Sequence, residues 1–165
     1  MAVLGRQVLL VAVSSALIVL CTVLLWTRPQ PDLVKSLPAT PAVHTRLQAF
    51  VFFRSADCSG NLAFARLFQR PRYRGAIHLT GVLLEGADEV AEASSQLRRM
   101  GVTMPILVAS KQLRQAIRPV APGSGPLLVI VDRSSRLRML MPTPRNPTET
   151  RHLATLLDGL AATEP

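Results

Sequence analysis

Apolar and polar residues follow one another along residues 46–162 in blocks that alternate between strand-like and helix-like patterns. Short, mostly apolar runs bounded by polar, Gly or Pro residues are typical of buried strands. They occupy residues 47–53, 77–84, 106–109, 127–131 and 137–141. Between and after them, apolar residues at helical spacing predict helices over 61–69, 88–100, 111–118 and 148–160. This alternation predicts βαβ units, and the turn at residues 132–136 predicts a final antiparallel pair of strands.

Capping residues fix several of the predicted helix ends. Ser110 is placed to cap the helix that begins at residue 111. Gly101 follows a helical pattern, where a left-handed C-terminal cap belongs. Asn146, Pro147 and Glu149 predict the start of the last helix, with Glu149 closing a capping box.

The N-terminal part of the chain has a different pattern. After a short tail at residues 1–7, residues 8–26 form an uncharged apolar run of 19 residues that ends at Trp26. A helix of this length crosses the roughly 30 Å hydrocarbon core of a bilayer. A cleaved signal peptide is the alternative, but its apolar segment usually has only about 7–15 residues. The run therefore predicts a transmembrane anchor.

Prolines dominate the segment between the apolar run and the first predicted strand. Residues 27–45 contain Pro29, Pro31, Pro38 and Pro41 among polar residues. Proline resists helix and sheet, so this segment predicts an extended tether, with one compact domain at residues 46–162.

The net charge of +9 raises the question of nucleic acid, but aromatic residues make up only 4% of the chain. Without a stacking platform, the spread of Lys and Arg predicts no nucleic-acid partner. It predicts a solvated basic surface, which also suits anionic lipid headgroups.

Cysteine and histidine are too sparse for a disulfide framework or a metal site. Cys21 lies in the apolar run and Cys58 in the predicted domain, so no structural disulfide is expected. His44, His78 and His152 are scattered without ligand spacing. No metal or other cofactor is expected.

The candidate chemistry lies at Cys58, between an apolar strand and a helical pattern. A thiol in the first turn of a helix meets free backbone N–H groups and the positive end of the helix dipole, which favour the thiolate. Arg54 and the backbone near Gly60 would add to this effect, whereas Asp57 would oppose it. The sign of the net pKa shift stays open at this point.

Two motifs resemble the thioredoxin-like family, in particular its membrane-tethered redoxin branch. Phe53 and Cys58 keep the spacing between the family's aromatic strand end and its first active-site cysteine. Pro126, the following apolar strand and Asp132 resemble the family's cis-proline, buried strand and hairpin. The resemblance implies a three-layer α/β sandwich around a mixed sheet and a protein thiol or disulfide as partner. It also implies an extracytoplasmic location for the domain.

The sequence departs from the family at Asn61, which occupies the position of the second, resolving cysteine. No Cys-x-x-Cys disulfide can form, so the leading hypothesis is mixed-disulfide chemistry by Cys58 alone. A non-catalytic interaction module is the alternative. A one-cysteine peroxidase is a third, weaker hypothesis, because Ser55 and Cys58 match a peroxiredoxin motif that lacks its opening proline here.

Overall fold

The computed structural model describes residues 31–38, 45–59, 62–120 and 125–163. A compact unit begins at Pro31 and runs to Pro165. The predicted tail and span, together with Cys21, His44, Gly60 and Asn61, lie outside the described residues. Among the helices that can be described, none is long and apolar enough to cross a bilayer.

In the described part of the chain, five strands form one mixed sheet. They are β1 (Leu47–Phe53), β2 (Ile77–Leu83), β3 (Ile106–Val108), β4 (Leu127–Asp132) and β5 (Leu137–Pro142), in the order β3-β2-β1-β4-β5. β1, β2 and β3 are parallel, β4 is antiparallel to β1, and β5 is antiparallel to β4. The predicted α/β architecture and its final antiparallel pair are confirmed.

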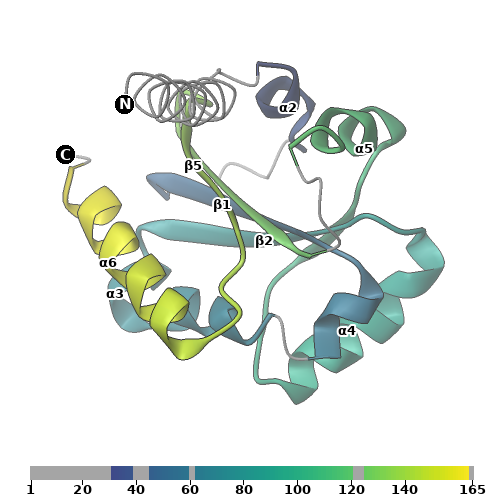
Figure 1. The fold of residues 1–165 in the computed structure, drawn as a ribbon, viewed down its shortest axis with the longest axis horizontal. Helices are drawn as coiled ribbons and strands as arrows, with labels where there is room; N and C mark the ends of the chain where they lie inside the picture. Colours follow the sequence, from purple (N-terminus) through teal and green to yellow (C-terminus); the bar gives the residue numbers. More distant parts are fainter. Residues whose placement is uncertain (1–30, 39–44, 60–61, 121–124, 164–165) are drawn as a thin grey trace, which may run out of the picture. The chain divides into compact units, whose positions relative to one another are not determined.

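Helices cover both faces of this sheet (Figure 1). One face carries α2 (Pro31–Ser36) and α5 (Lys111–Ile117). The other carries the 3-10 helices η1 (Ser55–Ser59) and η2 (Ala63–Gln69), followed by α3 (Pro71–Arg74), η3 (Ala87–Glu89), α4 (Val90–Arg99) and α6 (Pro147–Thr163). The fold therefore has three layers.

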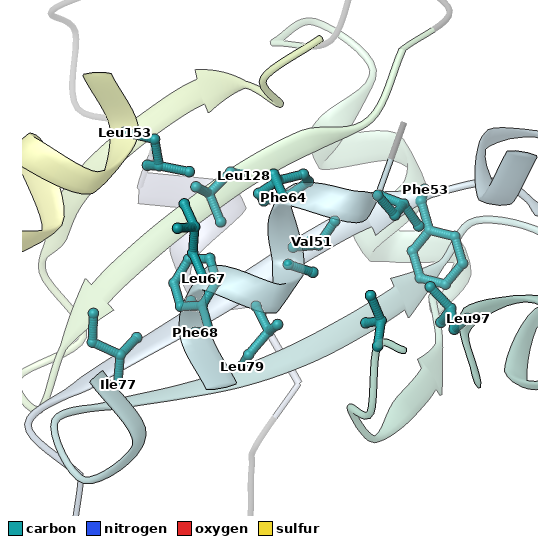
Figure 2. Close-up of a cluster of buried hydrophobic side chains, with 14 of the residues drawn as sticks. Val51, Phe53, Phe64, Leu67, Phe68, Ile77, Leu79, Leu97, Leu128 and Leu153 are labelled. Carbon is teal, nitrogen blue, oxygen red and sulfur yellow. The ribbon is translucent and has the colours of Figure 1, made fainter. Parts of the chain in front are cut away.

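Alternating side chains of the central strand fill the two cores. Val51 and Phe53 of β1 pack on the η2 and α6 face, where Figure 2 shows them with Leu128 and Leu153. Phe50 and Phe52 of β1 pack on the α2 and α5 face. Successive side chains of a strand point to opposite faces, so one apolar run supplies both cores. This explains why residues 49–53 are continuously apolar.

The predicted caps are present in the structure. The side chain of Ser110 accepts a hydrogen bond from Leu113 N at 3.1 Å, and that of Asn146 accepts one from Glu149 N at 2.9 Å. Gly101 has a φ of +69°, and its N–H donates to the carbonyl of Arg98 at 2.9 Å. Each group satisfies a helix-end donor or acceptor that would otherwise lack a partner.

Two predicted segments differ from the structure. Residues 61–69 were expected to form an α-helix, but η2 is a 3-10 helix that ends at Gln69, and its C-cap Arg70 has an extended ψ of 142°. Pro71 follows directly, and a residue before proline is driven out of the α region. The second difference is the tether. Residues 31–36 form α2, because Pro31 stands at the first helical position, where proline is well tolerated, and Leu33 is fully buried in the core beneath α5.

Candidate functional site

The register of the sheet brings the two candidate motifs to the same edge. Phe52 near the end of β1 pairs with Leu127 at the start of β4. Cys58 lies five residues after the end of β1, and Pro126 directly precedes β4. Segments that are almost seventy residues apart in the sequence therefore meet at one edge of the sheet, as the family resemblance implied.

Cys58 lies in η1 and not in the first turn of an α-helix. Arg54 N donates a 2.8 Å hydrogen bond to Asp57 Oδ2, and Asp57 N donates a 2.9 Å bond to the carbonyl of Arg54. These reciprocal bonds close a tight turn over residues 54–57, and the next described helical segment begins separately at Ala63. A five-residue 3-10 helix lacks the long row of aligned peptides that gives an α-helix its dipole. The expected stabilisation of a thiolate by a helix dipole is therefore wrong.

The thiol of Cys58 is buried. Its residue is only 2% exposed and belongs to the core cluster that contains Phe53 and Leu62. An apolar environment disfavours the charged form of a thiol, because the thiolate loses its hydration there. Burial is the largest cause of a rise in the pKa of Cys58 to about 11.

Three carboxylates act in the same direction as burial. Asp57, Glu85 and Glu92 each raise the pKa of Cys58, because a thiolate next to a negative charge is disfavoured. Glu85 is held against η1 by the backbone N–H and the hydroxyl of Ser55, which donate to Glu85 Oε2 at 2.6 Å and 2.7 Å. Arg54 is exposed and is not among the causes of the shift. The direction of the pKa shift, which the sequence left open, is therefore upward, and Cys58 is held as the neutral thiol.

Glu85 and Glu92 were missed in the sequence. For Glu85 the available signal was its position, because it follows the end of β2 and β2 lies beside β1. Parallel neighbouring strands end at the same edge of a sheet. A residue two positions after β2 is therefore expected near a residue two positions after β1, where Ser55 is found.

Pro126 does not have the expected cis geometry. No cis peptide bond occurs among the described residues, so the bond from Gly125 to Pro126 is trans. Pro126 is buried, and its carbonyl accepts a 3.0 Å hydrogen bond from Thr143 N next to the end of β5. The trans form is the lower-energy one for X–Pro bonds, and here it lets Pro126 lead directly into the β4–β5 ladder.

Four candidates from the sequence remain to be placed. Gly60 and Asn61 lie outside the described residues. His78 is half-buried on β2, and His152 is exposed on α6. Within the described ranges, no group of three His, Cys, Asp or Glu side chains is placed to hold a metal ion.

Alkali should destabilise the domain. Besides Cys58, Tyr73 is 1% exposed, and burial together with its 2.6 Å hydrogen bond to Asp158 raises its pKa to about 12. The unfolded chain releases both protons at lower pH than the folded chain does. The free energy of unfolding should therefore be unaffected below about pH 8 and fall, by on the order of 5 kcal/mol for the two groups together, as the pH rises to about 12.

Urea unfolding across this pH range measures the effect. Tyr73→Phe should flatten the upper part of the profile, because the substituted ring has no proton to release. A wild-type profile that stays flat or rises between these pH values would contradict the raised pKa values.

Several solved structures have an architecture similar to that of this chain. A thioredoxin-family thiol:disulfide interchange protein from Chlorobium tepidum matches with a TM-score of 0.54 at 13% identity, covering 73% of this chain and 83% of the other. The chain has a thioredoxin-like fold. A thioredoxin-related protein from Neisseria meningitidis matches this thioredoxin-like domain with a TM-score of 0.52 at 12% identity, over 74% and 93% of the two chains.

A secreted disulfide oxidoreductase from Mycobacterium tuberculosis matches with a TM-score of 0.51 at 10% identity, over 76% of this chain and 91% of the other. No family model matches the sequence, and no curated protein matches it. At these identities the similarity concerns the fold, and the chemistry must be argued from the residues of the thioredoxin-like domain itself.

Proposed function

We propose that this protein is a thioredoxin-fold interaction module. Its Cys58 stays a thiol and forms no covalent bond with the partner. The observation that carries the proposal is the state of Cys58, which is 2% exposed and has a pKa raised to about 11. The thiolate is the nucleophile in disulfide exchange. With this pKa only about one thiol in ten thousand is ionised at pH 7, compared with about one in a hundred for a cysteine with the ordinary pKa of 9.0.

The residue at position 61 supports the same conclusion. Asn61 replaces the resolving cysteine of the family pattern, so a mixed disulfide on Cys58 would have no internal thiol to release it. The catalytic pair is thus lost from the sequence, while the fold that brings η1 and β4 to one edge is kept. A partner that binds at this edge would be held by non-covalent contacts.

Mixed-disulfide chemistry is the second candidate function. It is favoured by the position of Cys58 and Pro126 at one sheet edge and by solved structures of similar fold that are described as thiol:disulfide interchange proteins. In this mechanism a partner opens η1, the Cys58 thiolate attacks one sulfur of the partner's disulfide, and the other sulfur leaves as a thiolate. An external thiol then releases the partner.

For the location of the module, we propose an anchor at residues 8–26 and a domain on the extracytoplasmic side of the membrane. The uncharged run supports the anchor. The extracytoplasmic side is supported by the secreted oxidoreductase of similar fold. An oxidising compartment would leave a buried, protonated thiol intact, because oxidation proceeds through the accessible thiolate.

A chromosomal Cys58→Ser substitution tests the proposal against its rival. The module should keep the wild-type phenotype in a strain where deletion of the whole gene has a measurable effect, since serine is close to cysteine in size and no covalent step is lost. Non-reducing gels of cells quenched with an alkylating agent should show no high-mass adduct that depends on Cys58. Cys21→Ser is the matched control. A Cys58→Ser strain that behaves like the deletion strain, together with a Cys58-dependent adduct in wild type, would establish the covalent mechanism.

A further inference from the structure

Three cationic side chains and one glutamine lie along the exposed side of α5. Lys111, Arg114, Gln115 and Arg118 are all exposed and are spaced i, i+3, i+4 and i+7, which places them along one helical stripe. The opposite side of the helix is buried through Leu113 and Ile117, at 2% and 4% exposure. The helix therefore packs on the sheet with one side and presents three positive charges on the other.

Few carboxylates are close enough in sequence to neutralise this stripe. Residues 93–131 contain no Asp or Glu. Within the described parts of the chain, neither Lys111, Arg114 nor Arg118 forms a salt bridge. This distribution contrasts with the edge around Cys58, where Asp57, Glu85 and Glu92 gather.

Helix α2 extends the same surface. It contacts α5 and is held there by Leu33, which is fully buried. Figure 1 shows α2 and α5 next to one another on one face of the sheet. Lys35 of α2 is exposed, with Asp32 as the one acidic residue of that helix. We call Lys35, Lys111, Arg114, Gln115 and Arg118 the cationic face.

The chain itself limits how far the cationic face can lie from a bilayer. The predicted span ends at Trp26 and α2 begins at Pro31, so residues 27–30 are all that separate them. Even a fully extended chain advances only about 3.3–3.6 Å per residue, so if residues 8–26 span the bilayer, Pro31 can be at most about 18 Å from the end of the span. Because α2 contacts α5, the same tether would also limit the distance of α5 from the bilayer.

We propose that the cationic face of α2 and α5 lies on the surface of the anchoring bilayer and binds anionic lipid headgroups. This inference rests on the anchor of the proposed function and not on the chemistry of Cys58. Lys and Arg side chains next to a membrane are attracted to anionic lipids over about one Debye length, which is roughly 10 Å at 0.1 M salt. Binding through the cationic face would orient the domain. One face of the sheet would be turned toward the lipid, and the other face, with α4 and α6, would be turned away from it.

The sequence offers a direct probe of this face, because Lys35 and Lys111 are the two lysines of the whole chain. The full-length protein is reconstituted into phosphatidylcholine vesicles with or without about 30% phosphatidylglycerol. A membrane-impermeant amine reagent then labels the outward-facing domains, and mass spectrometry gives the rate at each lysine. Labelling of Lys111 should be at least about threefold slower in the anionic vesicles, and about 0.5 M salt should abolish the difference.

Two variants sharpen the test. Arg151→Lys places a reporter amine at an exposed position of α6, on the other side of the sheet, and its rate should be the same in both kinds of vesicle. Arg114→Gln combined with Arg118→Gln should remove the protection of Lys111 while leaving the circular dichroism spectrum unchanged, because both side chains are exposed.

Each other outcome overturns the proposal. Equal labelling of Lys111 in the two vesicles means that the face does not contact anionic lipid. Protection that is equal in neutral and anionic vesicles and insensitive to salt means that another surface, such as a second copy of the chain, covers the face. If the protein fails to float with neutral vesicles, the anchor is wrong and this inference falls with it, whereas the proposal for Cys58 is unaffected.

Discussion

Native Cys58 is expected to react with iodoacetamide about a hundredfold more slowly than the same thiol in the unfolded chain at pH 8. The pKa near 11 lies about two pH units above that of an unperturbed cysteine, so the thiolate fraction falls by that factor. Burial at 2% exposure restricts access of the reagent and slows the reaction further. Peptide mass spectrometry separates the Cys58 signal from that of Cys21, and guanidinium chloride provides the unfolded reference.

A pair of matched variants isolates the electrostatic part of this effect. Glu85→Gln keeps an oxygen that accepts the hydrogen bonds from Ser55 but removes the charge, so the alkylation rate should rise and its pH midpoint should fall. Glu89→Gln is the control, because Glu89 is not among the causes of the shift and its removal should change neither quantity. A native Cys58 that reacts as fast as the unfolded thiol would refute the buried, protonated state. The mixed-disulfide mechanism would then become the leading hypothesis.

Leu33→Ala is expected to lower the free energy of unfolding by about 2–5 kcal/mol, the range for removing a fully buried leucine side chain. Leu33 is 0% exposed and packs with Phe50 and Leu113 between α2, α5 and the sheet. Its loss would leave a cavity and remove most of the contact that keeps α2 in place. Urea unfolding followed by circular dichroism measures the change.

The matched control is Leu156→Ala on α6. Leu156 is 37% exposed, so the same truncation should cost well under 1 kcal/mol there. If the two variants are equally stable, Leu33 is not part of the core, residues 31–36 revert to the extended tether that their prolines suggested, and the cationic face loses its link to the anchor.

Local patterns in the sequence were sufficient for most of the fold. Short apolar runs predicted the strands closely, and the helix caps at Ser110, Asn146 and Gly101 were found where the sequence placed them. These features depend on residues within a few positions of one another, which is why one sequence reveals them. The order of elements and the spacing from Phe53 to Cys58 also indicated the thioredoxin-like architecture, which the solved structures of similar fold confirm.

The chemical state of the site depended on contacts that no local pattern contains. Whether Cys58 is a thiol or a thiolate is decided by its burial against Leu62 and by Glu85, which the pairing of β1 with β2 brings next to Ser55. In the same way, the prolines before residue 45 predicted a tether, but the burial of Leu33 beneath α5 made residues 31–36 a helix. The sequence by itself determined the strands, the caps and the position of the cysteine. The tertiary structure decided its protonation and the docking of α2, because desolvation and charge act between residues far apart in the chain.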